Sequence, residues 1–195
     1  MRMSSQLTYI ALVFLLGFRT ECSAQKFKIE ILQEGKIIEV IDEMIELEKK
    51  EFQIRVTLKK QEGVFMNASY QKDYYALKPS DPIKDYEYID LKTMAEVEFN
   101  TDKELFIHDE YFNYLFYNKA KNWHRFDKEL VFKGKKVIGT KTVQNLWGVN
   151  NKETTKLKDV KKDIYLFFVA PNDRSKEKVP KELGRYKIHV KWKRF

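Results

Sequence analysis

Residues 163–170 read DIYLFFVA, and residues 186–192 read YKIHVKW. The first stretch is apolar at nearly every position, which is typical of a strand buried on both faces and therefore central in a sheet. The second alternates apolar residues with lysine and histidine, the pattern of a strand with one buried and one solvated face. A charged loop separates the two stretches. Together they predict an antiparallel pair of strands with residues 163–170 at the centre of the sheet.

The same alternation recurs earlier in the chain. Residues 27–31 (FKIEI) and residues 52–59 (FQIRVTLK) place an apolar side chain at every second position. Glu34-Gly35 follows the first run and predicts a turn. Short alternating strands separated by turns predict a mainly β chain folded as an antiparallel β-sandwich. An immunoglobulin-like arrangement is compatible with this pattern, although the sequence lacks the paired cysteines that mark true immunoglobulin domains.

Three segments do not follow the alternating pattern. Residues 37–47 fit either two short strands or one amphipathic helix. Apolar residues at helical spacing favour one short helix near 110–121, whereas the Tyr and Phe content of that segment favours a strand. The sequence of residues 79–82, Pro-Ser-Asp-Pro, cannot lie inside a strand or helix. We therefore expect a long loop at about 71–92.

The N-terminus has the features of an export signal. Arg2 precedes a ten-residue apolar run, YIALVFLLGF at 9–18, and Ser23-Ala24 offers small residues for cleavage. Residues 1–24 are therefore predicted to be a signal peptide, and residues 25–195 a single β-sandwich domain that is periplasmic or extracellular. The run is shorter than the roughly 20 apolar residues that span a bilayer, so we expect no membrane-spanning segment.

Cys22 is the single cysteine of the chain. A cysteine directly after an apolar run is the lipidation site of bacterial lipoproteins, where small residues precede it. Here Arg19, Thr20 and Glu21 precede it, so a lipid anchor through Cys22 is a minor alternative. With Cys22 removed alongside the signal peptide, no disulfide framework is expected.

The sequence carries no recognisable catalytic motif. It has no G-x-S-x-G, no H-E-x-x-H and no glycine-rich phosphate loop, and its three histidines lack the short spacing of helical zinc sites. We therefore expect no catalytic residue, no metal and no cofactor. Carboxylates are plentiful, which leaves open a carbohydrate-active hydrolase that uses a pair of them. A purely structural cell-envelope protein is a further alternative.

Aromatic and basic residues supply the candidate binding surfaces. Exposed tyrosines offer stiff, amphipathic contact area, and lysines favour an anionic partner. Residues 25–110 carry a net charge of −7 and residues 111–195 a net charge of +14. The tyrosines could instead cover one end of the sandwich, and the lysines could protect an edge strand from aggregation. The candidate binding residues are Tyr70, Tyr74, Tyr75, Tyr86 and Tyr88 in or beside the long loop, and Lys187, Lys191 and Lys193 on the last strand.

These observations predict an exported, non-enzymatic binding or assembly domain that contacts a protein or a glycan. The basic half of the chain favours an anionic partner. For an exported protein we expect no nucleic-acid partner. No motif in the sequence identifies the ligand or the oligomeric state.

Overall fold

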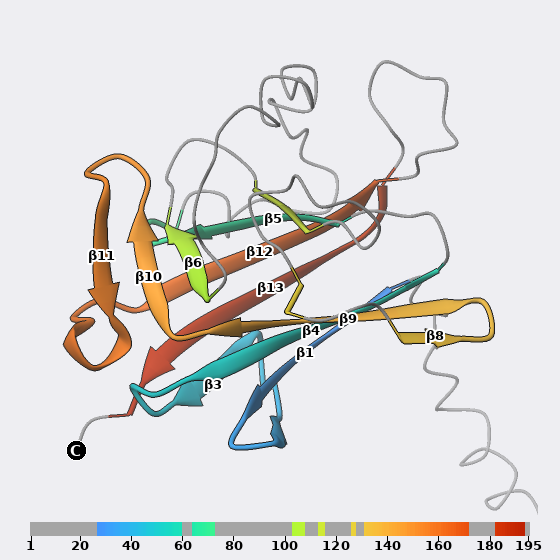
Figure 1. Ribbon diagram of the computed structural model, residues 1–195, viewed down its shortest axis with the longest axis horizontal. Coiled ribbons are helices and arrows are strands. Elements are labelled where there is room, and N and C mark those ends of the chain that lie inside the picture. The colour runs from blue at the N-terminus through green and yellow to red at the C-terminus, as the bar shows by residue number, and fades with distance from the viewer. Residues whose placement is uncertain are drawn as a thin grey trace, which may run out of the picture.

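The computed structural model describes residues 27–59, 64–72, 103–107, 113–115, 126–127, 131–171 and 182–193. These residues form two five-stranded sheets and one three-stranded sheet in a sandwich-like arrangement, as Figure 1 shows. The predicted mainly β fold is therefore confirmed. The predicted signal peptide, Cys22 and the loop at about 71–92, apart from Gln71 and Lys72, lie outside the described residues. Among the described residues, no helix is long and apolar enough to cross a membrane.

The first large sheet, sheet A, contains the N-terminal strands. Every neighbouring pair in it is antiparallel. Its strands, in spatial order, are β2 (Lys36–Ile38), β1 (Phe27–Gln33), β4 (Phe52–Lys59), β9 (Lys136–Val143) and β8 (Val131–Lys133). The short strands β2 and β8 are its two edges.

The second large sheet, sheet B, contains the two stretches that predicted a strand pair. Its strands, in spatial order, are β3 (Met44–Leu47), β13 (Glu182–Trp192), β12 (Ile164–Pro171), β5 (Val64–Ser69) and β7 (Asn113–Leu115). Strand β12 is central and antiparallel to both β13 and β5, which confirms the prediction. Strand β3 is parallel to β13, so sheet B is mixed.

Strand β12 is buried on both faces, as its unbroken apolar sequence predicts. Ile164, Leu166 and Phe168 are 0% exposed and belong to the main core cluster. Phe167 and Val169 point to the opposite face and are 1% and 0% exposed. Burial of an aromatic or aliphatic side chain of this size contributes about 1.5–3 kcal/mol. The central strand is therefore a large part of the driving force for folding.

The third sheet closes one end of the sandwich. It consists of β6 (Glu104–Ile107), β10 (Asn145–Gly148) and β11 (Glu153–Lys156), with β10 in the middle. Strand β9 ends at Val143 and β10 begins at Asn145, so the chain passes from sheet A into the third sheet within one residue. A 3-10 turn, η2 (Leu157–Asp159), follows β11 and leads toward β12.

The core lies between sheets A and B. On β4, Phe52, Ile54, Val56 and Leu58 are at most 2% exposed, while the alternating side chains Gln53, Arg55 and Thr57 are only partly buried. The apolar residues of both sheets form one continuous cluster. Period-two alternation in sequence thus becomes a single core between two sheets.

Two tight turns with left-handed backbone reverse the chain direction between residues 33 and 44. Glu34 (φ 51°) and Gly35 (φ 76°) join β1 to β2 in the geometry of a type I′ hairpin turn. Ile41 and Met44 then exchange two backbone hydrogen bonds of 3.0 and 2.8 Å around Asp42 and Glu43. Residues 37–47 therefore form two short strands and no helix.

The short helix expected near 110–121 is wrong at the residues that the structure describes there. Asn113–Leu115 forms strand β7, which pairs with the edge of β5 through the register Val64↔Leu115. The open edge of β5 supplies hydrogen-bond partners that outweigh a weak helical spacing. The rest of that range lies outside the described residues, and the immunoglobulin-like arrangement stays an interpretation of the strand pattern.

The central strand allows a direct test of the fold. We expect Phe168→Ala to lower the free energy of unfolding by about 3–5 kcal/mol, because it removes a buried ring and leaves a cavity. Phe132→Ala is a matched control, because Phe132 is 62% exposed and exposed substitutions usually change stability by at most about 0.5 kcal/mol. Urea denaturation of both variants at low protein concentration measures the difference. Equal losses would contradict the placement of β12.

Candidate functional site

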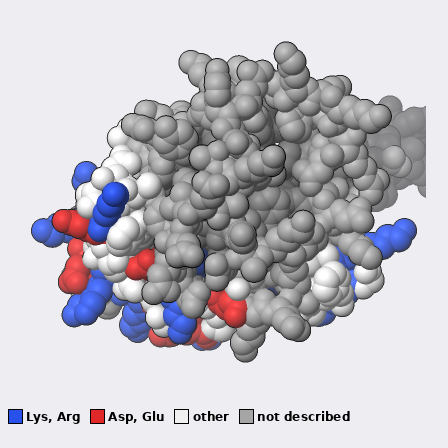
Figure 2. All heavy atoms as spheres, turned by 45° about the horizontal axis from the view of Figure 1, so that its top comes forward, with Lys and Arg blue, Asp and Glu red and all other residues white. Residues whose placement is uncertain are grey.

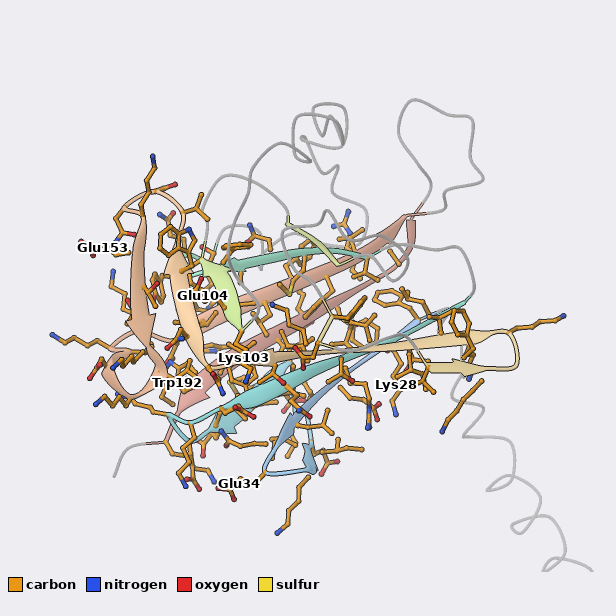
Figure 3. All side chains as sticks on the ribbon, in the orientation of Figure 1. Lys28, Glu34, Lys103, Glu104, Glu153 and Trp192 are labelled. Atoms are coloured by element: carbon orange, nitrogen blue, oxygen red, sulfur yellow. The ribbon has the colours of Figure 1, made fainter. Side chains whose placement is uncertain are left out.

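A basic pocket lies where three segments meet at the C-terminal end of β13. The connection between β3 and β4, the segment around η2, and the end of β13 surround a cavity of about 470 Å³. Figure 3 labels Trp192 at this place. The described residues that line the pocket are Lys49, Lys50, Lys158, Lys161, Asp163, Trp192 and Lys193. Five of these seven residues are lysines, and we call this site the basic pocket.

Local packing directs Lys158 and Lys161 to the surface of the segment around η2. Leu157 and Val160 are 3% and 1% exposed and belong to the core cluster. The Val160 N–H donates to the Leu157 carbonyl at 3.2 Å, which closes the 3-10 turn. With the two apolar side chains anchored inward, the two lysines that follow them are exposed and face the pocket.

A buried glutamine holds the connection that carries Lys49 and Lys50. Gln33, at the end of β1, is 8% exposed. Its side-chain carbonyl accepts the Glu48 N–H at 2.9 Å, and its side-chain amide donates to the Glu48 carbonyl at 3.0 Å. These two bonds satisfy the backbone of a residue that lies outside the strands. The β3–β4 connection is therefore fixed to the C-terminal end of β1 in sheet A.

Trp192 is fixed on the core side of the pocket. It is 9% exposed, and its indole Nε1–H donates to the Lys162 carbonyl at 2.8 Å. Its ring meets Phe52 edge to face, with 6.4 Å between the centroids. The next residue, Lys193, donates its N–H to the Leu47 carbonyl at 2.8 Å. The end of β13 therefore has one defined position beside β3.

The charges of the pocket are only partly neutralised. The Lys50 ammonium lies 2.7 Å from the Glu48 carboxylate and 3.3 Å from Glu34. The hydrogen bond from Lys50 lowers the pKa of Glu48, and Lys193 lowers it further. Within the described part of the chain, the other four lysines of the pocket make no ion pair. The pocket therefore carries an excess of positive charge.

Asp163 is the carboxylate among the described lining residues, and it already has a partner. Its Oδ2 lies 2.9 Å from His189 Nε2. The His189 ring is stacked on Tyr165 with a centroid separation of 4.5 Å and an interplanar angle of 20°. Stacking and hydrogen bonding orient the imidazole, which in turn holds Asp163 at the border of the pocket.

The arrangement is suited to binding an anion. Lysine ammonium groups around a concave surface attract carboxylate, sulfate or phosphate groups. Among the described residues, no group of three His, Cys, Asp or Glu side chains could hold a metal ion. The chemistry that the described side chains offer here is therefore charge recognition beside an aromatic surface.

The candidate residues from the sequence have different positions in the structure. Lys193 lines the basic pocket, whereas Lys187 and Lys191 lie on β13 outside the described lining. Tyr70 is partly buried and packs against the core, with the Lys162 ammonium 5.8 Å from its ring centroid. The other four candidates, Tyr74, Tyr75, Tyr86 and Tyr88, lie outside the described residues.

Of the seven lining residues, only Lys193 is among the candidates from the sequence, and the least expected of the other six are Lys49, Lys50 and Trp192. The two lysines belong to the acidic half of the chain, so the charge count of that half concealed them. The signal that could have found them is local, because they separate the apolar positions of β3 and β4 and therefore lie in a connection. In the sequence Trp192 has the pattern of an ordinary core residue. It lines the pocket because it is the last residue of β13.

The lowered pKa of Glu48 gives a test of the geometry. Lys50→Met removes the main cause, so we expect the pKa of Glu48 to rise, and Lys193→Met should raise it less. Because the folded pKa is lowered, the stabilisation is present above the unfolded pKa and is lost as the pH falls through the folded pKa. NMR titration of the Glu48 side chain measures each value. An unchanged pKa in Lys50→Met would contradict the ion pair.

No protein-family model, curated protein or solved structure matches this chain.

Proposed function

We propose that the protein is an exported, non-enzymatic binding domain that holds an acidic group of a glycan in the basic pocket. The observation that supports this most is the lining of a 470 Å³ cavity by five lysines and Trp192. Export itself is supported by the pattern of residues 1–24 in the sequence.

An anionic ligand follows from the electrostatics. Ammonium groups that share one concave surface repel each other, so an anion that enters the pocket relieves this repulsion and gains attraction. Lys49, Lys158, Lys161 and Lys193 make no ion pair within the described residues, and Lys193 acts on Glu48 only at longer range. Since the attraction acts near the surface, salt should weaken it.

A glycan unit fits the size and composition of the pocket. Small-molecule sites usually measure about 300–1,000 Å³, and 470 Å³ lies in that range. The exposed part of the Trp192 ring supplies an apolar contact beside the ammonium groups. A sugar with a carboxylate or sulfate has an apolar ring face and an anionic group, which match these two contacts. An acidic protein surface is the competing partner, and the experiment below separates the two.

The described lining favours binding over hydrolysis. A glycosidase uses two carboxyl groups about 5–10 Å apart across the substrate. Among the described lining residues Asp163 is the only carboxylate, and it is bonded to His189. A purely structural role does not account for five lysines around one cavity, four of which make no ion pair within the described residues.

Thermal-shift measurements on the protein test the proposal. The ligands are a sulfated polysaccharide, a polyuronate, a lipopolysaccharide, a neutral glucan and an acidic peptide. A ligand at 100 times its Kd adds about 2.7 kcal/mol, which corresponds to roughly 5–10 °C in Tm for a domain of this size. We expect a shift with the acidic glycans, lost in high salt, and none with the neutral glucan.

A matched pair of variants locates the binding site. Lys158→Glu/Lys161→Glu reverses two charges in the pocket and should abolish the shift. Lys133→Glu/Lys135→Glu changes the net charge equally at the remote β8–β9 hairpin and should retain it. If both variants lost the thermal shift equally, the ligand would be attracted by the overall charge of the protein, and the proposal of binding in the basic pocket would be wrong. A shift only with the acidic peptide would replace the glycan with a protein partner.

A further inference from the structure

The exposed large apolar side chains of the described residues gather in two places. Phe132 and Ile41 are each 62% exposed, the largest values among them. One group lies between β2 and the start of β3, and the other lies on β8. The six residues are Ile37, Val40, Ile41 and Met44 in the first group, and Val131 and Phe132 in the second. Such clusters on a protein surface mark sites of association.

Both groups lie at edges of sheet A. Its order is β2-β1-β4-β9-β8, so the first group borders one edge and the second forms the other. Within the described residues, β2 pairs only with β1 and β8 only with β9. An edge strand presents unpaired backbone N–H and C=O groups that can accept another strand. As far as the described part of the chain shows, the two edges are open, and they lie on opposite sides of the same sheet.

The two edges carry opposite charges. Residues 36–46 contain one lysine and four carboxylates, a net charge of −3, and we call them the acidic edge. Residues 131–136, VFKGKK, contain three lysines, a net charge of +3, and we call them the basic edge. All residues of the basic edge are exposed. Figure 1 shows that the hairpin of β8 and β9 projects from the sandwich, and Figure 2 shows basic side chains on that side.

The backbone of the acidic edge is held in an uncommon conformation. Asp42 and Glu43 have φ values of 48° and 61°, and neither is glycine. Left-handed backbone costs an ordinary residue about 1–2 kcal/mol. The turn places Ile41 and Met44 side by side, both more than a third exposed. The acidic edge therefore exposes two neighbouring apolar side chains next to its carboxylates.

We propose that a second copy of this chain docks its basic edge against the acidic edge of the first. Strand β8 of one copy lies beside β2 of the other, Val131 and Phe132 cover the apolar residues of the acidic edge, and the lysines face its carboxylates. Pairing of like edges would oppose charges of the same sign. An anionic membrane would attract the basic edge but repel the acidic one and leave its apolar residues uncovered.

Such a contact is heterologous, so it leaves one free acidic edge and one free basic edge on every pair. Addition of further copies can then continue in one direction. Because β2 and β8 are three residues long, we expect weak association that depends on concentration. Salt should weaken it, since it depends on opposite charges.

Sedimentation velocity of the full chain over a range of concentrations tests the proposal. We expect the mean mass of the wild type to rise with concentration and pass that of a dimer. Ile41→Glu places a charge among the apolar residues of the acidic edge, and Phe132→Glu does the same at the basic edge. Each variant alone should therefore stay monomeric. An equimolar mixture contains one intact edge of each kind, so it should form dimers and nothing larger.

Charge reversal at exposed positions provides a second series of variants. Lys133→Glu/Lys135→Glu or Glu39→Lys/Asp42→Lys alone should abolish association, and the combination of all four should restore it. The pocket variant Lys158→Glu/Lys161→Glu should associate like the wild type, which separates this proposal from glycan binding. A wild type that stays monomeric at the highest concentration, association that survives either single-edge change, or a mixture without dimers would overturn the proposal.

Discussion

The burial of β12 on both faces sets the arrangement of the other strands. A strand with apolar side chains on both faces is stable only when strands flank its edges and other residues cover it. Strands β13 and β5 pair with the two edges of β12, and the core-facing residues of β4 and β1 cover one of its faces. Once β13 is paired with β12, its C-terminal end is fixed beside β3, and Lys193 reaches the basic pocket.

The basic pocket is built from connections held by ordered structure. Buried side chains fix each of its walls, Gln33 behind the β3–β4 connection, Leu157 beneath η2 and Phe52 against Trp192. Binding residues are often placed on loops that a rigid scaffold positions. The backbone segments that carry the lysines are therefore held by buried neighbours, which suits the proposed binding of an anion.

The fold mixes the acidic and basic halves of the chain without cancelling their charge everywhere. Strand β4 comes from the acidic half and pairs with β9 from the basic half. Within the acidic half, Glu30 lies 2.9 Å from Arg55, and this hydrogen bond lowers the pKa of Glu30. Charge is left unbalanced at the basic pocket and at the two edges of sheet A. The two proposed contacts, with a glycan at the basic pocket and with a second copy of the chain at the edges, would neutralise this charge.

Four strands, and which of their faces are buried, could be predicted from local sequence alone. Residues 27–31, 52–59 and 186–192 show period-two alternation, and residues 163–170 form an almost unbroken apolar run. Glu34-Gly35 predicts its turn, and all of these signals are local in the sequence. Three features appear only in the folded chain: the strand at Asn113–Leu115, the complete burial of Lys141 in register with Ile54, and the lining of one pocket by both Lys49 and Lys193. These outcomes depend on partners far away in sequence, and strand order, which is set by the packing of the whole core, has no local signature.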